Sequence, residues 1–570
     1  MKTLHSEIKS GEIVKNISTL LVENASKFGN KIVFQEKVDG IYKGISWDKF
    51  LSEIKNIASN LIDLGFEKGE KMIIYSPNRL EMLELELAVM SIGGVAVPIF
   101  AYFKEDTAKL LMEHSDATYL AVAEQLQLDR TDHNLPFKKV IHFDDVKDDK
   151  FNNLISFKNL LSANKNEVLD LDISPDDICL NMYTSGTMGT PKCVQLSHKN
   201  ILSQQAAIKE ILKVNQEDKF LSYLPWHHSF GGIFELFSAL YNGATYSVES
   251  SFGKDVKVII ENWKEIKPTV FFSVPKVYQN LVELCNQDED TKQLFFNSGL
   301  KFIFTAAASL PINLSNLFQE KGITVVEGWG LTETSPCCTL TNPDLERQTG
   351  VVGVPIPGVS LRIAEDDEIQ VKGPNVMKEY YKNEEANKDI FTEDGWYKTG
   401  DVGSITSSGL KLISRKDRIF KLSNGEKVIP TDLEKIIEKK CHYVQYVIVS
   451  GTGNDYPVAL IFPNQNLLKN PDYQKSPEDG CFCPRNINEF GRCLQGCLKQ
   501  SNDELKQKFA KIKKAVVLDS SLSLEDNTLT PSMKMAPKNV LEKYKSYYLN
   551  MYGEQLSTED NLYIIDLEDE

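Results

Sequence analysis

The sequence predicts an α/β fold with a large N-terminal domain, built of several subdomains around parallel-type sheets, and a small α+β C-terminal domain. The chain has 570 residues, which is too long for one ordinary hydrophobic core. Strand and helix patterns alternate through most of the chain, as is typical of parallel sheets covered by helices. Near Asp401 the pattern changes to short strands and turns.

The first elements follow from the spacing of apolar residues. Residues 47–64 have apolar side chains at helical spacing, residues 71–75 predict a short strand, and residues 80–92 predict a second helix. Glycines 93 and 94 are expected to end that helix before a buried strand at 95–100. Further helices and strands are expected at 201–212, 256–266, 270–273 and 314–320.

The C-terminal part has a different pattern. Residues 402–419 predict a hairpin with its tip at Ser407, Ser408 and Gly409. A helix at 430–440 and strands at 443–449 and 458–462 are expected to follow. We therefore predict an N-terminal domain of residues 1–416 and a C-terminal domain of residues 417–570.

Composition excludes some classes of protein. The formal net charge of −16 argues against nucleic-acid binding, which needs clustered Lys and Arg. The N-terminal residues lack the apolar core of a signal peptide, and the ten cysteines do not form the pattern of a disulfide framework. We expect a cytoplasmic protein, and the sequence leaves peripheral membrane contact and oligomeric state open.

Four of the cysteines lie close together in the sequence. Cys481, Cys483, Cys493 and Cys497 fall within 17 residues and could supply thiolate ligands to Zn²⁺. The Cys-x-Cys spacing is tighter than that of usual zinc fingers, and no matching His is close. The pattern favours free thiols or a redox pair, and it leaves metal binding open.

A loop rich in Gly, Ser and Thr follows an apolar strand at 178–182. Its glycines allow close backbone approach, so that successive N–H groups can surround an anion. The residues expected to bind phosphate are Thr184, Ser185, Gly186, Thr187, Gly189 and Lys192. The loop is not a Walker A motif, because Pro191 replaces the second Gly and a strand follows instead of a helix. The alternative is a surface turn.

The loop at 183–194 resembles the phosphate loop of the ANL adenylate-forming superfamily, which includes acyl-CoA synthetases, peptide-synthetase adenylation domains and luciferases. Four more segments resemble the family's motifs in the family's order, at 328–333, 397–401, 414–418 and 529–534. The resemblance implies the ANL fold, with a mobile C-terminal domain, and an enzyme that forms an acyl-adenylate from ATP and a carboxylic acid. Met188 and Cys193 depart from the usual phosphate loop.

The resemblance also assigns roles to the segment Gly328-Trp329-Gly330-Leu331-Thr332-Glu333. Glu333 matches the Mg²⁺-associated carboxylate, and Thr332 matches a hydroxyl that contacts the α-phosphate. Trp329, between its two glycines, matches an aromatic residue that covers the adenine, although a packed core aromatic explains it as well. Ala307 and Ala308 match small residues beside the adenine, and a buried strand end is the alternative.

Further roles are implied for the last third of the chain. Asp401 matches the carboxylate that accepts hydrogen bonds from the ribose hydroxyls, and Arg415 matches its neighbour at the ribose and phosphate. Lys534 matches the catalytic lysine, although Pro537 stands where the family usually has Arg. Asp417 matches the hinge between the two domains.

Two more residues are assigned to the acyl and thiol substrates. Gly425 matches a position at the coenzyme A tunnel, and an ordinary Asn-Gly turn is its alternative. His228 matches a position near the substrate carboxylate. Residues 424–430 and 530–534 resemble the long-chain synthetase versions of their motifs, so the implied substrates are a fatty acid, ATP with Mg²⁺, and coenzyme A.

Three functions are therefore compared. The first is an AMP-forming long-chain fatty acid–CoA ligase. The second is an acyl-ACP synthetase or a fatty acyl-AMP ligase, although a surface with net charge −16 does not favour an acidic carrier protein. The third is a non-catalytic acyl- or nucleotide-binding protein, against which the intact Lys534, Glu333 and Asp401 argue.

Overall fold

The computed structural model describes residues 2–147, 150–163, 169, 172–184, 192–296, 299–306, 310–342, 348, 350–469, 484–523, 525–530, 534–553 and 561–567. The chain divides into two compact units. The first contains residues 1–184, 191–399 and 404–411, and the second contains residues 185–190, 400–403 and 412–570.

One sheet of the first unit has the strand order β10-β9-β5-β4-β6-β7-β8. Its strands are β4 (Lys71–Tyr75), β5 (Val95–Ile99), β6 (Tyr119–Val122), β7 (Lys139–His142), β8 (Leu154–Ser156), β9 (Ile178–Thr184) and β10 (Lys192–Ser197). Neighbouring strands run parallel, except that β10 is antiparallel to β9. β4 and β5 are almost completely buried, as expected for a sheet covered by helices.

A second sheet has the order β17-β16-β15-β14-β13-β11-β12-β2-β3. Its strands are β2 (Ile32–Val38), β3 (Ile41–Ser46), β11 (Lys219–Ser222), β12 (Thr245–Val248), β13 (Val270–Ser273), β14 (Phe302–Thr305), β15 (Thr324–Trp329), β16 (Thr339–Leu340) and β17 (Val354–Pro355). The strands from β2 through β12, β11, β13 and β14 to β15 run parallel. The sheet therefore brings early and late parts of the unit together, as in the pairing of Phe34 with Tyr246.

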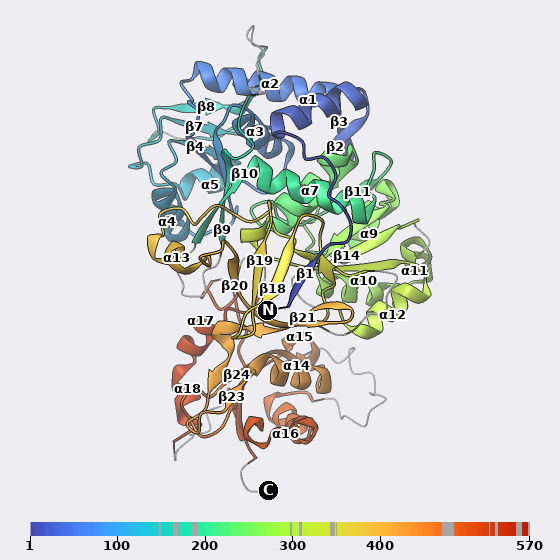
Figure 1. Cartoon of the computed structure of the whole chain (residues 1–570), viewed down its shortest axis with the longest axis vertical. Helices are drawn as coiled ribbons and strands as arrows, with labels where there is room; N and C mark the ends of the chain where they lie inside the picture. The colour runs from blue at the N-terminus through green and yellow to red at the C-terminus, as the bar shows by residue number, and fades with distance from the viewer. Residues whose placement is uncertain are drawn as a thin grey trace. The chain divides into compact units, whose positions relative to one another are not determined.

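Helices cover these sheets in the first unit. They are α1 (Ile17–Phe28), α2 (Trp47–Asp63), α3 (Leu80–Ser91), α4 (Glu105–Ser115), α5 (Gln125–Asp129), α6 (Phe157–Leu160), α7 (His198–Leu212), α8 (Leu236–Asn242), α9 (Val256–Ile266), α10 (Pro275–Gln287), α11 (Glu289–Phe296), α12 (Ile312–Glu320) and α13 (Glu384–Asp389). Ser46 caps α2, because its hydroxyl accepts a hydrogen bond from the N–H of Lys49. α1 and α2 lie side by side in Figure 1, and both pack against α3.

A third sheet has the order β1-β18-β19-β20-β21. Its strands are β1 (Thr3–His5), β18 (Ser360–Ile363), β19 (Glu368–Lys372), β20 (Tyr397–Thr406) and β21 (Gly409–Arg415). β1 is antiparallel to β18, with His5 opposite Ser360. The division between the two units runs through β20 and β21.

The second unit contains a sheet of order β24-β25-β26-β27 and the hairpin β22-β23. Its elements are β22 (Phe420–Lys421), β23 (Lys427–Val428), α14 (Pro430–Lys440), β24 (Val444–Ser450), β25 (Val458–Pro463), α15 (Gln465–Lys469), α16 (Ile487–Glu504), β26 (Lys514–Leu518), α17 (Pro537–Lys543), α18 (Lys545–Asn550) and β27 (Leu562–Asp566). Alternate residues of β24 enter two hydrophobic clusters: Val447 and Val449 enter one, and Ile448 enters the other.

The α/β class predicted from the sequence is confirmed. The predicted helices at 256–266 and 430–440 and the strand at 270–273 match α9, α14 and β13 residue for residue. The predicted hairpin at 402–419 corresponds to β20 and β21, and Ser407 and Ser408 connect them.

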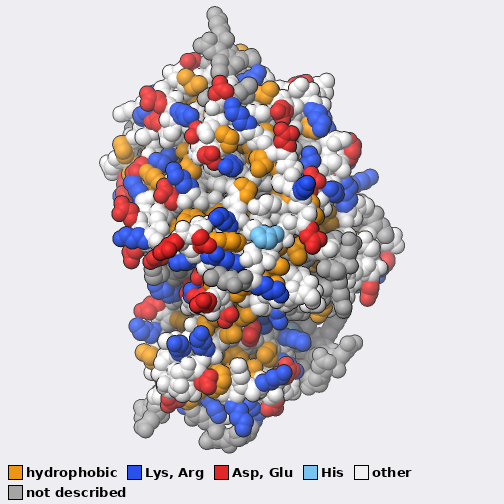
Figure 2. All heavy atoms as spheres, viewed as in Figure 1, with side chains coloured by type: hydrophobic (Ala, Val, Ile, Leu, Met, Phe, Trp, Pro, Cys, Tyr) orange, Lys and Arg blue, Asp and Glu red, His pale blue; other side chains and the backbone are white. Residues whose placement is uncertain are grey.

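Surface charge is mixed on the face shown in Figure 2, where acidic and basic side chains alternate over short distances. Within the described ranges, every helix is too short or too polar to cross a membrane.

Candidate active site

The predicted adenine-contacting segment lies at the end of β15, where two glycines are required by packing. A Cβ atom on Gly330 would lie 1.7 Å from the carbonyl oxygen of Pro336, and one on Gly328 would lie 2.7 Å from the ring of Phe304. The contact at Gly330 is far too short for any side chain. Trp329 is buried between these glycines, and its carbonyl accepts a hydrogen bond from the N–H of Cys338.

Thr332 and Glu333 follow in a short 3-10 helix, η2 (Thr332–Thr334). The hydroxyl of Thr332 lies 3.0 Å from the hydroxyl of Ser229. Glu333 is 8% exposed, and the hydroxyl of Tyr380 donates a hydrogen bond of 2.6 Å to its Oε1 atom. A hydrogen bond to a charged group contributes about 1.5–3 kcal/mol, so Tyr380 fixes the position of this carboxylate.

Lys192 lies close to the same tyrosine. It begins β10 and pairs with Thr184 at the end of β9, so both predicted phosphate contacts stand at the two ends of the predicted loop. The Nζ atom of Lys192 is 4.9 Å from the centroid of the Tyr380 ring, within the range of a cation–π interaction. Tyr380 thus contacts a predicted metal-binding carboxylate and a predicted phosphate-binding lysine.

His228 lies in the turn that leads into the π-helix η1 (Phe230–Glu235). Its Nδ1 atom accepts a hydrogen bond of 3.3 Å from the N–H of Phe230, and its carbonyl accepts one from the N–H of Gly232. The neighbouring His227 packs on the ring of Phe100, and desolvation together with the charge of His228 lowers the pKa of His227 to about 3. His227 is therefore neutral at physiological pH.

The second unit contains an ion pair at the predicted ribose site. The Nη1 atom of Arg415 lies 3.0 Å from Oδ1 of Asp401, and the Asp401 side chain is 13% exposed. Gly400 has φ +69, and a Cβ there would lie 3.2 Å from Nη2 of Arg415. The glycine before Asp401 therefore leaves room for the guanidinium group.

Lys534 belongs to the second unit. Its carbonyl accepts a hydrogen bond from the N–H of Thr530, and its N–H donates to the Thr530 hydroxyl. As a residue Lys534 is exposed, but desolvation by surrounding protein atoms lowers the pKa of its ammonium group, and the charge of Asp401 opposes this shift. Lys534 and Asp401 therefore interact electrostatically within this unit.

The predicted hinge and tunnel residues are exposed. Asp417 belongs to the 3-10 helix η3 (Lys416–Arg418), and its Oδ1 atom lies 3.9 Å from Nε of Arg415. Gly425 has φ +85 in the turn between β22 and β23, where its N–H donates to the carbonyl of Leu422. The Asn-Gly turn expected as the alternative for Gly425 is thus present.

Several predicted residues lie outside the described residues. These are Ser185, Gly186, Thr187, Gly189, Ala307, Ala308, Cys481 and Cys483. Cys493 and Cys497 both lie on α16. Among the described residues, the structure contains no group of three or more side chains arranged to hold a metal ion.

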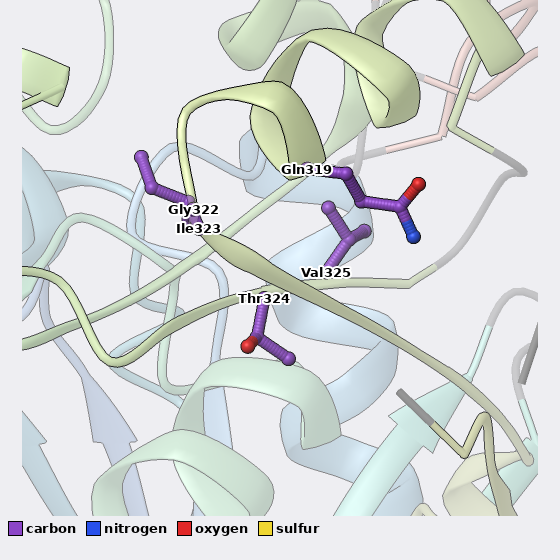
Figure 3. A pocket seen from close by; sticks show the side chains of 5 residues that line it. All are labelled: Gln319, Gly322, Ile323, Thr324 and Val325. Atoms are coloured by element: carbon purple, nitrogen blue, oxygen red, sulfur yellow. The ribbon is translucent and has the colours of Figure 1, made fainter. Parts of the chain in front are cut away.

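The sequence did not single out Tyr380. Its partner Glu333 lies 47 residues away, and helix α13 lies between Tyr380 and the nearest predicted motif at 397–401. The adjacent residues Tyr380 and Tyr381 stand out in the sequence, but the sequence does not distinguish which of the two tyrosines contacts Glu333. A pocket lined by Gln319, Gly322, Ile323, Thr324 and Val325 opens at the other end of β15 (Figure 3), and it contains none of the predicted site residues.

Comparison with known families decides the class. The model of the AMP-binding enzyme family matches residues 21–381, and the model of the AMP-binding enzyme C-terminal domain matches residues 417–555. The chain belongs to the AMP-binding enzyme family. The predicted membership of the ANL superfamily, of the long-chain fatty acyl-CoA synthetase type, is thereby confirmed.

This AMP-binding enzyme is similar to proteins named for fatty-acid activation. Long-chain-fatty-acid–CoA ligase FadD15 of Mycobacterium bovis is 24% identical, over 95% of this chain and 97% of the relative. Fatty acyl-CoA synthetase A of Dictyostelium discoideum is 26% identical, over 90% of this chain and 86% of the relative.

A solved structure confirms the fold of the AMP-binding enzyme. O-succinylbenzoate coenzyme A synthetase (MenE) from Bacillus subtilis, in complex with ATP and magnesium ion, superposes with a TM-score of 0.71 at 22% identity. The match covers 91% of this chain and 98% of the other.

Proposed function

We propose that this AMP-binding enzyme is a long-chain fatty acid–CoA ligase, which activates a fatty acid with ATP and transfers it to coenzyme A. The observation that carries the proposal is the match to a relative named as a long-chain-fatty-acid–CoA ligase over 97% of its length and to a fatty acyl-CoA synthetase over 86% of its length. Both family domains are present as well. ATP and coenzyme A are then substrates.

Glu333 fits a Mg²⁺ site. Mg²⁺ usually takes one or two carboxylates and completes its shell with substrate phosphates and water. Tyr380 hydrogen-bonds to the Oε1 atom of Glu333, and among the described residues the Oε2 atom has no hydrogen-bond partner. When bound, the ion neutralises charge on the phosphates. The magnesium complex of the Bacillus subtilis synthetase supports this assignment.

In the first step, a carboxylate oxygen of the fatty acid attacks the α-phosphorus of ATP, and pyrophosphate leaves. The carboxylate is already ionised at neutral pH, so the step needs charge neutralisation and positioning instead of a general base. Lys534 supplies a positive charge between the carboxylate and the α-phosphate, and Thr332 orients the phosphate. Arg415 holds the carboxylate of Asp401 in an ion pair. This carboxylate accepts hydrogen bonds from the ribose hydroxyls.

Further contacts to the nucleotide complete this assignment. Thr184, Ser185, Gly186, Thr187, Gly189 and Lys192 are assigned to the phosphates, and Ala307, Ala308, Gly328, Trp329 and Gly330 to the adenine. At position 330 there is no space for a side chain, which supports the assignment of a glycine to this close approach. His228 is assigned to the fatty-acid carboxylate, and the π-helix beside it supports a specialised backbone at this point.

In the second step, the thiolate of coenzyme A attacks the acyl carbon, and AMP leaves. We assign residues 1–416 to an adenylate-forming domain and residues 417–570 to a domain that moves about Asp417 between the steps. The start of the second family match at residue 417 supports this boundary. Gly425 is assigned to the coenzyme A tunnel on the resemblance of its motif, and its exposed turn has no atoms within 4 Å of an added Cβ.

We also propose that the enzyme works in the cytoplasm. Cys179, Cys193, Cys285, Cys337 and Cys441 are free thiols, which supports a reducing compartment. Peripheral contact with a membrane would give access to long-chain acids.

The experiment is a pyrophosphate-release assay over a panel of carboxylic acids, with ATP and Mg²⁺, run with and without coenzyme A. With labelled oleate and coenzyme A we expect oleoyl-CoA and AMP. Adenylate without thioester, even with coenzyme A present, would identify a fatty acyl-AMP ligase. Thioester formed only on acyl carrier protein would identify an acyl-ACP synthetase. No pyrophosphate with any acid would indicate a binding protein.

A further inference from the structure

Tyr380 is held by a residue of the nearby helix α13 and by a strand that lies far from it in the sequence. Asn387 binds its backbone twice: the N–H of Tyr380 donates to Oδ1 of Asn387 at 2.9 Å, and Nδ2 of Asn387 donates to the carbonyl of Tyr380 at 2.8 Å. Tyr380 also forms a β-bridge with Val194 of β10. Tyr380 as a residue is 4% exposed.

The flanking residues fix the same segment at both ends. The N–H of Met377 donates to the carbonyl of Glu333 at 2.8 Å, so the backbone of the segment is bound to the residue that the Tyr380 hydroxyl contacts. Tyr381, on the opposite side of the extended chain, donates to Asp116 at 2.7 Å and accepts from Lys71 at 3.1 Å. The position of the Tyr380 ring is therefore determined before any ligand binds.

Through two of its contacts, the Tyr380 side chain joins groups of opposite charge. Its hydroxyl donates to the carboxylate of Glu333, and the face of its ring receives the ammonium group of Lys192. The hydrogen bond fixes the orientation of the Glu333 carboxylate. The ring attracts the ammonium group of Lys192. Because the ring carries no formal negative charge, this contact leaves the ammonium group available to a phosphate.

We propose that Tyr380 is a positioning residue that sets the geometry of metal binding at Glu333 and of phosphate binding at Lys192 together. This inference rests on the proposed function only in taking ATP as the ligand. Tyr380 orients Glu333 through its hydroxyl and Lys192 through its ring. The two effects are therefore separable by substitution.

The test is isothermal titration calorimetry of ATP binding at a series of Mg²⁺ concentrations, with no acid or coenzyme A. Tyr380→Phe removes the hydroxyl and keeps the ring. Loss of such an outer hydrogen bond typically reduces metal affinity by about tenfold to a hundredfold, so the Mg²⁺ concentration for half-maximal ATP binding should rise by that factor. ATP affinity measured without Mg²⁺ should be unchanged. Tyr380→Leu should weaken ATP binding in the absence of Mg²⁺ as well.

Tyr381→Phe is the matched control. It deletes the same atom one residue away, where the hydroxyl contacts Asp116 and Lys71 instead of Glu333. Its Mg²⁺ dependence should equal that of the wild type. Thermal unfolding of each variant shows whether the fold is retained. Equal Mg²⁺ dependence for Tyr380→Phe and Tyr381→Phe would overturn the proposal, as would a Tyr380→Phe effect on ATP affinity that is independent of Mg²⁺.

The outcome is independent of whether the enzyme is a fatty-acid ligase. A wild type that binds Mg²⁺ and ATP but releases no pyrophosphate with any acid would contradict the proposed function, while the calorimetric comparison would still decide the role of Tyr380. A wild type that releases pyrophosphate with fatty acids, but shows no effect of Tyr380→Phe on Mg²⁺ dependence, would contradict only this inference.

Discussion

The backbone of the loop at Lys534 is held independently of the lysine side chain. Main-chain groups of Lys534 bond to Thr530, and Leu529 pairs with Met535 across the loop. A substitution that shortens the side chain leaves these bonds in place. The effect of removing the ammonium group can therefore be measured without loss of the loop.

Lys534→Ala should slow pyrophosphate release far more than it weakens ATP binding. A donor that stabilises charge mainly in the transition state contributes about 3–4 kcal/mol, or roughly a hundredfold to a thousandfold in rate. Single-turnover pyrophosphate release and calorimetry of ATP measure the two quantities. The exposed Lys538, at the start of α17, provides the control Lys538→Ala. Equal losses of rate and of ATP affinity would contradict the assigned role.

Sequence motifs were sufficient to find residues whose chemistry is local. Glu333 stands at the end of a recognisable hexamer, and Gly330 is required by a contact with Pro336 six residues later. Tyr380 could not be found in this way, because its role depends on tertiary contacts with β10 and η2. Only the fold shows that Tyr380, and not Tyr381, contacts the carboxylate.

Helix α3 shows a similar limit of prediction from sequence at the level of an element. The sequence predicts a helix at 80–92, and α3 spans Leu80–Ser91. Two of its carboxyl groups, on Glu84 and Glu86, are nevertheless almost completely buried. A helix covered by α1, α2 and the strands beneath it has no solvent-facing side, so alternation of polar and apolar residues could not reveal its burial.

Burial raises the pKa of Glu86 to about 8, so this carboxyl group makes stability depend on pH. Between its unfolded pKa, about 4, and 8 the folded state retains a proton that the unfolded state loses. Stability therefore falls by up to about 1.4 kcal/mol per pH unit as the pH rises through this range. Glu86→Gln should remove this contribution. The melting temperature of the variant minus that of the wild type should therefore increase from about pH 5 to about pH 8, because only the wild type loses this stability.

Melting temperatures across that pH range, compared with those of Glu261→Gln on the exposed face of α9, provide the measurement. The control should show the same pH dependence as the wild type. A constant difference between Glu86→Gln and the wild type at every pH would show that Glu86 does not titrate in this range.

At the scale of the whole molecule, each unit has its own hydrophobic core. The second unit has clusters on both faces of its sheet, and a separate cluster lies under α4 in the first unit. The alternation of helices and strands predicted the α/β class. It could not predict which distant strands pair, such as β2 with β12, because each pairing joins segments that local patterns describe separately.

A buried ion pair allows the second unit to be destabilised separately. Nη2 of Arg418 lies 2.5 Å from Oε1 of Glu434, and the N–H of Val449 donates to the same oxygen. Desolvation raises the pKa of Glu434, and the charge of Arg418 opposes this shift. Arg418→Met should destabilise the second unit by about 3–5 kcal/mol, because it leaves a buried carboxylate without its partner.

Hydrogen exchange measures this effect element by element. Exchange should accelerate in α14 and β24 and should be unchanged in α3 and β4. The double variant Arg418→Met/Glu434→Leu should recover most of the loss, since it removes both charges. Equal acceleration in the two units would show that they unfold as one.

The pairing of β1 with β18 affects the order in which the enzyme can fold during synthesis. His5 and Ser360 lie opposite each other, and their side chains are 2.8 Å apart across 355 residues of chain. At a ribosomal rate of about 5–20 residues per second, β1 waits roughly 20–70 seconds for its partner strand to emerge. During that time its hydrogen-bonding edge is open to other nascent chains, and a strand of three residues with Lys2 before it and Glu7 shortly after it offers them a poor template.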